Sequence, residues 1–333
     1  MINKKDIALA LVLLVVVLIL FVVSLAVGEV HIPLEQIWDI LKGNTVENQS
    51  FSYIIEARLN RTLMAILGGS SLAVAGLILQ VFFRNPLAGP GVLGISSGVT
   101  LGVAVVVLGG VSLSTMSSNI AMITSGLLGA FFILSLLMII SKYIINSVTL
   151  LIVGLMLSYF TSAFVNALYH WADLEQTRQF VVWGLGSFAD VNTEVIKMLS
   201  FMIIIIDLSL IFLVKPLNAL VLGESYAKSM GINIKVTKIL IIIITSLLTA
   251  LITVYCGPIA FIGIAVPQIV RQFSKSKSHQ VTLPLALLTG ALFAVLADVL
   301  IRLSGSQLPL NTITSLIGAP IIIWTILKMN KVR

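Results

Sequence analysis

The sequence predicts an all-α, polytopic membrane protein with about ten transmembrane helices. The prediction rests on the apolar composition, the series of long apolar runs and the distribution of charge between the loops. Of the 333 residues, 59% are hydrophobic and only 10% are charged, with a mean hydropathy of +1.13. A water-soluble domain carries about 25% charged residues, so this chain cannot cover a water-exposed surface. We therefore assign the net charge of +7 to loops at one membrane face rather than to a nucleic-acid-binding surface.

Ten apolar segments are predicted to span the membrane, since a bilayer core needs about 20 apolar residues per helix. The first follows Lys4 and Lys5, and we expect it to be retained because no small-residue cleavage motif follows it. The eighth is short and rich in Gly and Pro, so hydropathy supports it least. Residues 1–333 are expected to form one transmembrane domain without a soluble catalytic domain. The predicted spans are 7–28, 62–82, 92–110, 119–141, 148–168, 195–214, 238–256, 258–273, 283–303 and 312–328.

Ten spans place both termini at the same membrane face, and the charge of the loops tests that arrangement. The face that holds the termini carries most of the basic residues, and its only acids are Asp6 and Glu224. The other face carries most of the acids, among them Glu29, Glu35 and Asp173. Because basic loops stay in the cytoplasm, we expect both termini to be cytoplasmic.

Three segments between the spans are long. Residues 29–61 contain an amphipathic stretch, and residues 169–194 contain two tryptophans of the kind that anchor a chain at the membrane interface. Both are expected outside. Residues 215–237 form the only sizeable loop expected inside, where Gly223 and Gly231 bracket a short helical pattern. Such a compact element is a natural docking surface for a partner.

Residues that would carry catalysis or hold a metal are not grouped in this sequence. The single cysteine, Cys256, excludes an intrachain disulfide, and the three histidines make no metal-ligand pattern. No G-x-x-x-x-G-K-[ST] loop is present, so ATP is not bound in the way a P-loop enzyme binds it. We expect neither an enzyme activity nor a metal or cofactor bound by this chain.

Two carboxylates, Asp207 and Asp298, fall inside predicted spans and are therefore functional candidates. Arg302 follows Asp298 by one helical turn, so an intramembrane i,i+4 ion pair is expected, with a proton relay as the alternative. Asp207 has no partner nearby in the sequence. These two acids keep open a different class of function, a proton-coupled secondary transporter that works alone.

A series of motifs rich in small residues and prolines runs along the chain in a fixed order between residues 58 and 328. Asn60 lies inside the first motif and Gln268 directly follows the fifth. The motifs are Arg58–Leu63 (RLNRTL), Gly68–Gly76, Gln80–Pro90, Leu93–Gly98, Gly257–Pro267 and Leu316–Pro320, followed by Trp324.

This series resembles the permeases of type II ATP-binding-cassette importers, the family that carries iron–siderophore chelates, haem and cobalamin. Asn60 replaces the family's usual Pro, and Gln268 its usual His. The resemblance implies a permease in the bacterial inner membrane, working as a homodimer or with a paralogue. Two separate ATPase subunits would bind ATP–Mg inside, and a soluble or lipid-anchored substrate-binding protein would dock outside. The resemblance favours a ferric siderophore as cargo, with haem and cobalamin open.

The resemblance also implies roles for particular residues. Arg58, Arg61 and Arg302 fall where the family docks glutamates of the binding protein; interfacial anchoring, or for Arg302 the pair with Asp298, is the alternative. Residues 215–237 correspond to the family's coupling helices, which pack into a cleft on the ATPase. The residues expected to make that contact are Leu222, Gly223, Glu224, Ala227 and Gly231.

Candidate residues for the substrate path lie on the predicted fifth span. Small and weakly polar side chains suit a large substrate that must pass without binding tightly, although ordinary helix packing explains the same residues. The candidates are Met156, Ser158, Tyr159, Ser162 and Asn166.

Overall fold

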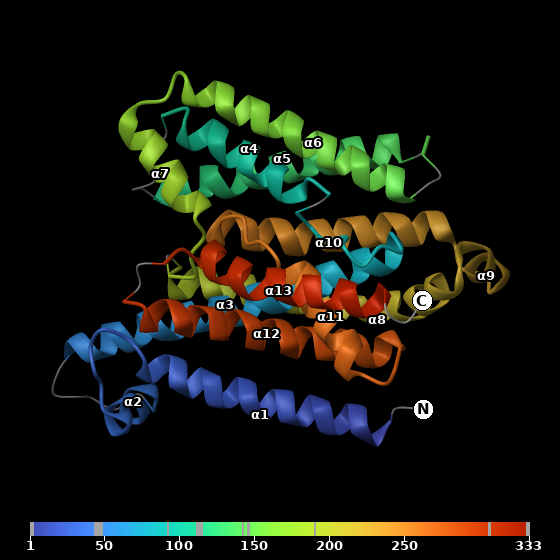
Figure 1. Ribbon diagram of the computed structural model, residues 1–333. Coiled ribbons are helices and arrows are strands. Elements are labelled where there is room, and N and C mark those ends of the chain that lie inside the picture. Colours follow the sequence, from blue (N-terminus) through green and yellow to red (C-terminus); the bar gives the residue numbers. More distant parts are fainter. Residues whose placement is uncertain are drawn as a thin grey trace.

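The computed structural model describes residues 3–42, 49–91, 93–110, 116–141, 143–144, 147–189, 191–305 and 308–330. Over these residues the chain is helical without a β-strand, which confirms the predicted all-α class. α1 begins and α13 ends at the same end of the bundle, which we call the terminal end (Figure 1). The helices are α1 (Lys4–Ala26), α2 (Leu34–Leu41), α3 (Gln49–Phe82), α4 (Ile95–Val107), α5 (Met116–Ile140), α6 (Ser147–Tyr169), α7 (Leu174–Gly184), α8 (Thr193–Leu222), α9 (Glu224–Ser229), α10 (Ile234–Cys256), α11 (Ile262–Phe273), α12 (His279–Leu303) and α13 (Leu310–Asn330).

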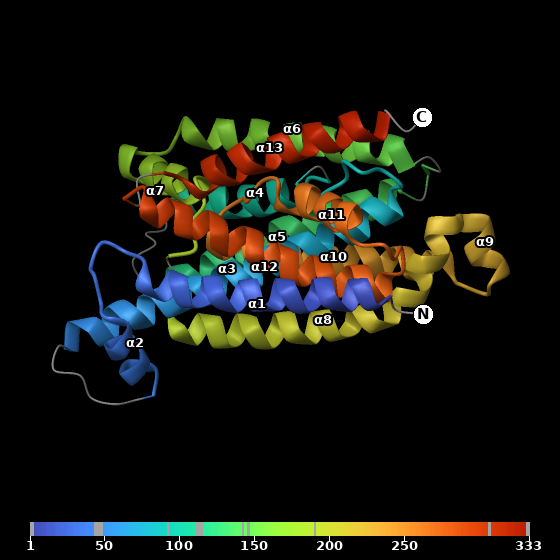
Figure 2. The same cartoon turned by 60° about the horizontal axis from the view of Figure 1, so that its bottom comes forward.

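Each predicted span overlaps one helix, namely α1, α3 to α6, α8 and α10 to α13. Seven of the described helices are long and apolar enough to cross a membrane, and Ile95–Val107 and Leu310–Thr325 are shorter apolar helices. The three helices left over lie at the ends of the bundle. α2 and α7 lie at the end opposite the termini, and α9 projects from the terminal end (Figures 1 and 2).

Two element boundaries differ from the prediction. α3 begins at Gln49 rather than near residue 62, so much of the segment 29–61 is helical. α3 continues through the RLNRTL motif, where Asn60 keeps the backbone N–H that a proline would lack.

The second difference concerns α8, which continues through Pro216 and ends at Leu222. The loop predicted at 215–237 thus starts only at Gly223. Leu217 and Leu220 keep α8 in place beyond the proline because both side chains are buried in the core. This burial offsets the one backbone hydrogen bond that Pro216 cannot donate.

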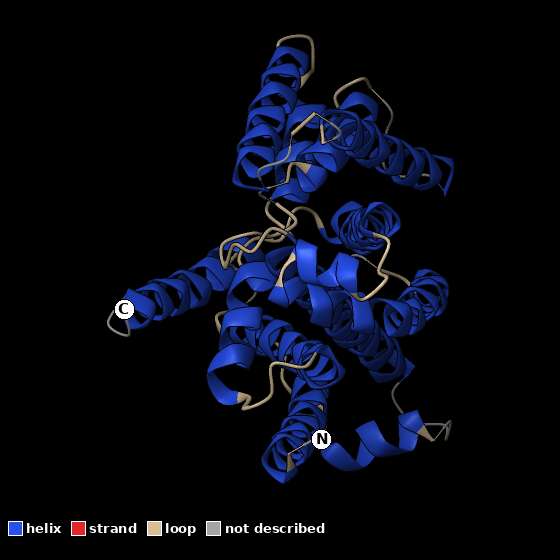
Figure 3. Ribbon diagram, turned by 90° about the vertical axis from the view of Figure 1, so that its right-hand side faces the viewer, coloured by secondary structure: helices blue, strands red, loops and turns tan. Residues whose placement is uncertain are grey.

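α3 is the central helix of the bundle and packs against α8, α10, α11 and α12. Within its apolar window 78% of the residues are buried, against 11% for the peripheral α1. Viewed from the terminal end, α1 and α13 lie at the rim (Figure 3). Gly69 of α3 lies against the backbone of Gly290 in α12, and Gly76 lies against the carbonyl of Gly263 in α11. Small residues therefore let these backbones approach closely, as membrane helices without a hydrophobic driving force require.

α11 has 12 residues and is about 18 Å long, which is too short for a hydrocarbon core of about 30 Å. The irregular segment 257–261 precedes it, and non-helical backbone at membrane depth needs internal hydrogen-bond partners. Asn311 of α13 supplies them. Its Oδ1 accepts from the Ala260 N–H at 3.0 Å, and its Nδ2 donates to the Pro258 carbonyl at 2.6 Å. One amide side chain thus holds the broken span together.

Candidate functional site

The three arginines expected at a docking surface gather at the end opposite the termini, but their guanidinium groups turn inward. Arg61 Nε donates to Asp298 Oδ1, and Arg302 Nη2 donates to Asp298 Oδ2, each at 2.6 Å. The Asp298 side chain is only 1% exposed. The pair expected between Asp298 and Arg302 is present, and Arg61, 237 residues away in sequence, joins it. We call these three residues the arginine–aspartate triad.

The triad and Arg58 also bind the end of α1. Arg58 donates to the carbonyls of Leu25 at 2.8 Å and Ala26 at 3.3 Å, and Arg302 donates to the carbonyl of Ser24. The last carbonyls of a helix lack partners within the helix, so these bonds cap α1. The four charged side chains therefore join α1, α3 and α12. Arg61, with 18% of its side chain exposed, is more open to solvent than Arg302 at 4%.

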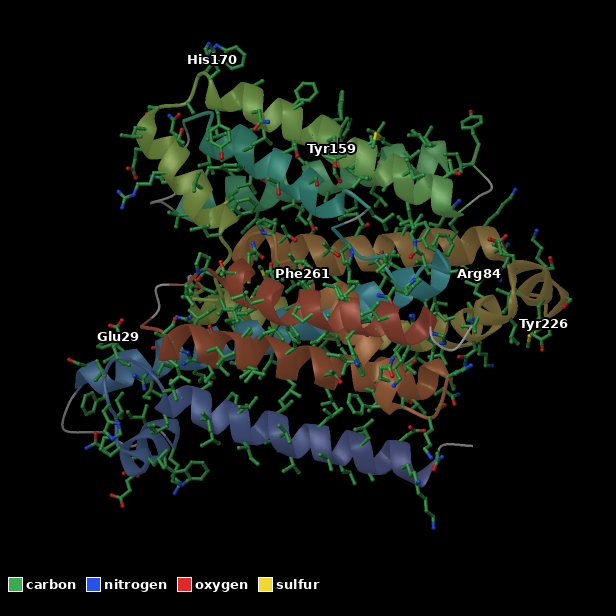
Figure 4. The ribbon with its side chains drawn as sticks, viewed as in Figure 1. Glu29, Arg84, Tyr159, His170, Tyr226 and Phe261 are labelled. Atoms are coloured by element: carbon green, nitrogen blue, oxygen red, sulfur yellow. The ribbon has the colours of Figure 1, made fainter. Side chains whose placement is uncertain are left out.

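At the terminal end, α8 and α9 meet at Gly223, whose φ of +129° is a backbone conformation suited to glycine. α9 is closed by Gly231, also at positive φ, and its Ala227 side chain is fully buried. The other side chains of this short helix face outward. Leu222, Tyr226 and Met230 are exposed apolar or aromatic groups, and Figure 4 shows Tyr226 projecting from this end. Of the five residues expected to contact an ATPase, Leu222, Glu224 and Gly231 are exposed and Gly223 is partly exposed around α9. Ala227 does not fit that expectation, because its side chain packs into the core.

Arg84 connects α3 with the last turn of α8. It has φ +47° and sits in a Schellman turn, in which the Arg84 N–H donates to the Val81 carbonyl and the Asn85 N–H to the Gln80 carbonyl. Glycine is the usual residue at this position. Here the arginine side chain reaches across, and Nη2 donates to the Leu220 carbonyl at 3.2 Å. Sequence reasoning assigned Arg84 no role, because this link needs knowledge of where α8 ends.

α6 presents an exposed face along one edge of the bundle. Met156, Tyr159, Ser162 and Asn166 are all exposed on it, and Figure 4 shows Tyr159 on this helix. Ser158 differs from these four, since it is partly buried and donates to the Gly154 carbonyl at 3.1 Å. Four of the five predicted path residues therefore share one surface, and the fifth lies toward α4.

A polar cavity of about 300 Å³ opens between α6 and α4. Ser162 and Asn166 line it from α6, and Ser97 and Thr100 line it from α4. Hydroxyl and amide groups can contact polar parts of a passing molecule without offering a charge or a metal ligand. Ser97 lies in the Leu93–Gly98 motif, but sequence reasoning assigned neither Ser97 nor Thr100 a role, because serine and threonine are common at membrane helix contacts.

Gln268 anchors the loop that precedes α4. Its Nε2 donates to Gln80 Oε1 at 3.1 Å and to the Pro86 carbonyl at 2.7 Å, and Gln80 Nε2 donates to the Ile264 carbonyl at 3.2 Å. The two glutamines are buried and join α3, α11 and the loop.

Asp207 lies midway along α8, where its Oδ1 is buried and has no hydrogen-bond partner among the described residues. The surrounding helix face is apolar, with Ile204, Leu208 and Ile211 exposed. No described cluster of three or more His, Cys, Asp or Glu residues could hold a metal ion.

Together these features define a polytopic helical membrane protein with a short helix protruding from one end and a polar face along α6. The chain belongs to the FecCD transport family, whose model matches residues 15–328.

Individual relatives match the chain over almost its whole length. The hemin transport system permease protein HmuU of Yersinia pestis is 31% identical over 325 residues, covering 96% of each chain. The vitamin B12 import system permease protein BtuC of Salmonella typhi is 31% identical over 332 residues, covering 98% of this chain and 97% of that one. An inward-facing structure described as a metal-chelate type ABC transporter superposes with a TM-score of 0.83 at 29% identity, covering 97% of this chain and 99% of the other.

Proposed function

We propose that this chain is the membrane-spanning permease subunit of an ATP-driven importer that moves a metal chelate, haem or a cobalamin-type molecule into the cytoplasm. The observation that carries the proposal is the end-to-end match with permeases of haem and vitamin B12 import, together with the structural match to a metal-chelate transporter. The permease itself does no bond chemistry. It offers a path with two packing states, open to one side or the other.

The exposed face of α6 supports a paired permease. Polar and aromatic side chains on a membrane helix need a partner surface or a water-filled path, because lipid cannot satisfy Ser162 or Asn166. A second copy of this chain, or a paralogue, would face α6 across a central path. The polar cavity between α6 and α4 would open onto that path.

The terminal end supports attachment of ATPase subunits and is the cytoplasmic end in this proposal. Leu222, Tyr226 and Met230 form a small apolar surface that protrudes beyond the bundle. An ATPase that holds this surface can push α9, and through it α8, when it binds and hydrolyses ATP–Mg. Arg84 would carry that movement to α3.

The opposite end would receive the substrate-binding protein. The arginine–aspartate triad with Arg58 contains three guanidinium groups and one carboxylate, so it leaves a net positive charge at this end. That charge attracts glutamates of a partner even though the arginines are bonded internally. Arg61 is the member of the triad best exposed to meet such a partner.

A ferric siderophore is our preferred cargo within this class, because the motifs resemble a family for which it is common, and haem is the next candidate. The comparisons give no support to a proton-coupled secondary transporter based on Asp207 and Asp298. The structure also gives Asp298 two arginine partners at 2.6 Å, so both of its carboxylate oxygens are engaged in ion pairs.

The test is co-expression of the chain with a candidate ATPase and a candidate binding protein, followed by measurement of ATPase activity in liposomes. We expect an ATPase to co-purify, and its activity to rise when the binding protein carries one of ferric siderophore, haem or cobalamin. Tyr226→Asp should abolish co-purification, whereas Lys235→Asp at the same end should not. An ATPase that binds the Tyr226→Asp variant as well as the wild type would contradict the assigned surface.

A further inference from the structure

A basic cavity of about 490 Å³ lies at the terminal end between α3, α8, α11, α12 and α13, separate from the α6 face. Its cationic lining comes from Arg84, Arg271, Lys275 and Lys277. Arg271, Lys275 and Lys277 make no side-chain ion pair or hydrogen bond with a described residue. We call this cavity the basic pocket.

Negative charge in the wall is sparse. Among the described residues, Asp6 is a carboxylate that bonds the lining: its Oδ1 accepts from Ser274 Oγ at 3.2 Å and from the Lys275 N–H at 3.0 Å. Three unpaired cations, together with Arg84, which donates to the Leu220 carbonyl, thus surround a space whose bonded carboxylate is engaged at one oxygen. Such an excess of unpaired positive charge favours an anionic ligand.

Thr282 gives an independent indication that a ligand belongs here. It is 95% buried, it lines the basic pocket, and its hydroxyl has no hydrogen-bond partner among the described residues. A threonine inside a helix normally donates to its own helix backbone. Thr245, Thr249 and Thr325 do so, with O···O distances of 2.7 to 2.8 Å. The Thr282 hydroxyl is unpartnered but has almost no accessible surface, so a rotation of this side chain must bring it to an oxygen in the pocket.

The surroundings of the pocket indicate what carries that oxygen. Part of its wall is apolar, with Leu77, Val81 and Val221 facing the same space. Deeper along the bundle, a groove of about 380 Å³ that is apolar apart from Thr289 lies between α1, α11, α12 and α13. Leu285 of the groove lies one helical turn beyond Thr282, and Ile321 lies one turn before Thr325, so pocket and groove share faces of α12 and α13.

We propose that the basic pocket binds a phosphate group, and that its source is the headgroup of an anionic phospholipid whose acyl chain occupies the apolar groove. Arg271 and Lys275 neutralise the phosphate, and the Thr282 hydroxyl donates to one of its oxygens. Basic pockets between membrane helices at the cytoplasmic face suit such headgroups. The proposal does not depend on the cargo or on transport.

Native mass spectrometry of the purified, delipidated full-length chain tests the site directly. Phosphatidylglycerol is the probe, phosphatidylcholine is the zwitterionic comparison and inorganic phosphate is the competitor. Arg271→Gln with Lys275→Gln should weaken phosphatidylglycerol binding about thirtyfold, from the loss of two cations near the headgroup. Thr282→Val, which keeps the side-chain shape, should weaken it about tenfold through the lost hydrogen bond to a charged group.

Lys228→Gln with Lys235→Gln is the matched control, since it removes two exposed charges from the same end outside the pocket. Thermal unfolding of each variant checks that it is folded. Displacement of the lipid by millimolar inorganic phosphate would show that the phosphate group alone suffices, whereas a lipid that stays bound would assign the source to the phospholipid. Equal losses in the pocket and control variants, or full binding by Thr282→Val, would overturn the proposal. The proposal would also be overturned if the wild type bound no lipid and the Arg271→Gln, Lys275→Gln variant lost a co-purifying ATPase. The pocket would then hold a protein segment.

Discussion

Replacing Asp298 by asparagine tests how far the arginine–aspartate triad holds the bundle together. The substitution keeps the side-chain shape but removes the negative charge between Arg61 and Arg302. Asp298 accepts two charge-assisted hydrogen bonds at 2.6 Å, and its side chain is 1% exposed. Removing one partner of a buried ion pair leaves an uncompensated buried charge and costs about 3–5 kcal/mol. Here two guanidinium groups lose their counter-charge, so we expect Asp298→Asn to lower the free energy of unfolding by an amount in that range.

The assay is equilibrium unfolding of the purified protein in mixed micelles, with helix content as the readout. Arg178→Gln is the matched control. Its ion pair with Glu175 has an N···O distance of 3.8 Å, and both side chains are largely exposed. An exposed pair of this kind contributes about 0–1 kcal/mol. If Asp298→Asn costs no more than Arg178→Gln, the triad does not hold α1, α3 and α12 together as we infer.

Three further substitutions test other contacts. Arg84 has a φ of +47°, which strains any residue other than glycine, so the Arg84→Gly variant should be about 1 kcal/mol more stable than Arg84→Ala. Both variants should lose the coupling between ATPase activity and transport. Equal stability of the two variants would show that the turn at Arg84 is not strained. Asn311→Ala should lower the free energy of unfolding by about 3 kcal/mol, since it leaves two backbone groups of the broken span unsatisfied, and an unchanged value would show that other groups replace it. Gly76→Ala should greatly reduce folded protein in the membrane, because its Cβ would overlap a backbone carbonyl, whereas Gly91→Ala, with open space around it, should express normally.

The sequence could predict the helical class and the approximate place of the helices that overlap the ten predicted spans, because length and apolarity are local properties of a membrane helix. The two helix boundaries that the sequence did not predict, the start of α3 and the end of α8, depend on what particular residues pack against. α3 extends through Asn60 to Gln49, and the buried Leu217 holds α8 in place past Pro216. A proline signal or a hydropathy window cannot report either effect, because both depend on what the helix packs against.

The contacts of the candidate site likewise fall into those that sequence spacing predicts and those that depend on the tertiary structure. The spacing of Asp298 and Arg302 predicts their ion pair, since residues four apart share a helix face. Nothing local connects Arg61 with Asp298 or Asn311 with Pro258, and those contacts needed the tertiary arrangement. The family resemblance grouped the three arginines, which the structure places at one end of the bundle, but it did not indicate that their guanidinium groups turn inward.

The most direct test of the proposed function is ATP-dependent uptake into proteoliposomes that contain this chain and its ATPase, supplied with binding protein loaded with radioactive ferric siderophore, haem or cobalamin. We predict uptake of one of these cargoes only when ATP is inside with the ATPase, and its loss with Tyr226→Asp. Uptake driven by a proton gradient without ATP, and abolished by Asp207→Asn, would contradict the account.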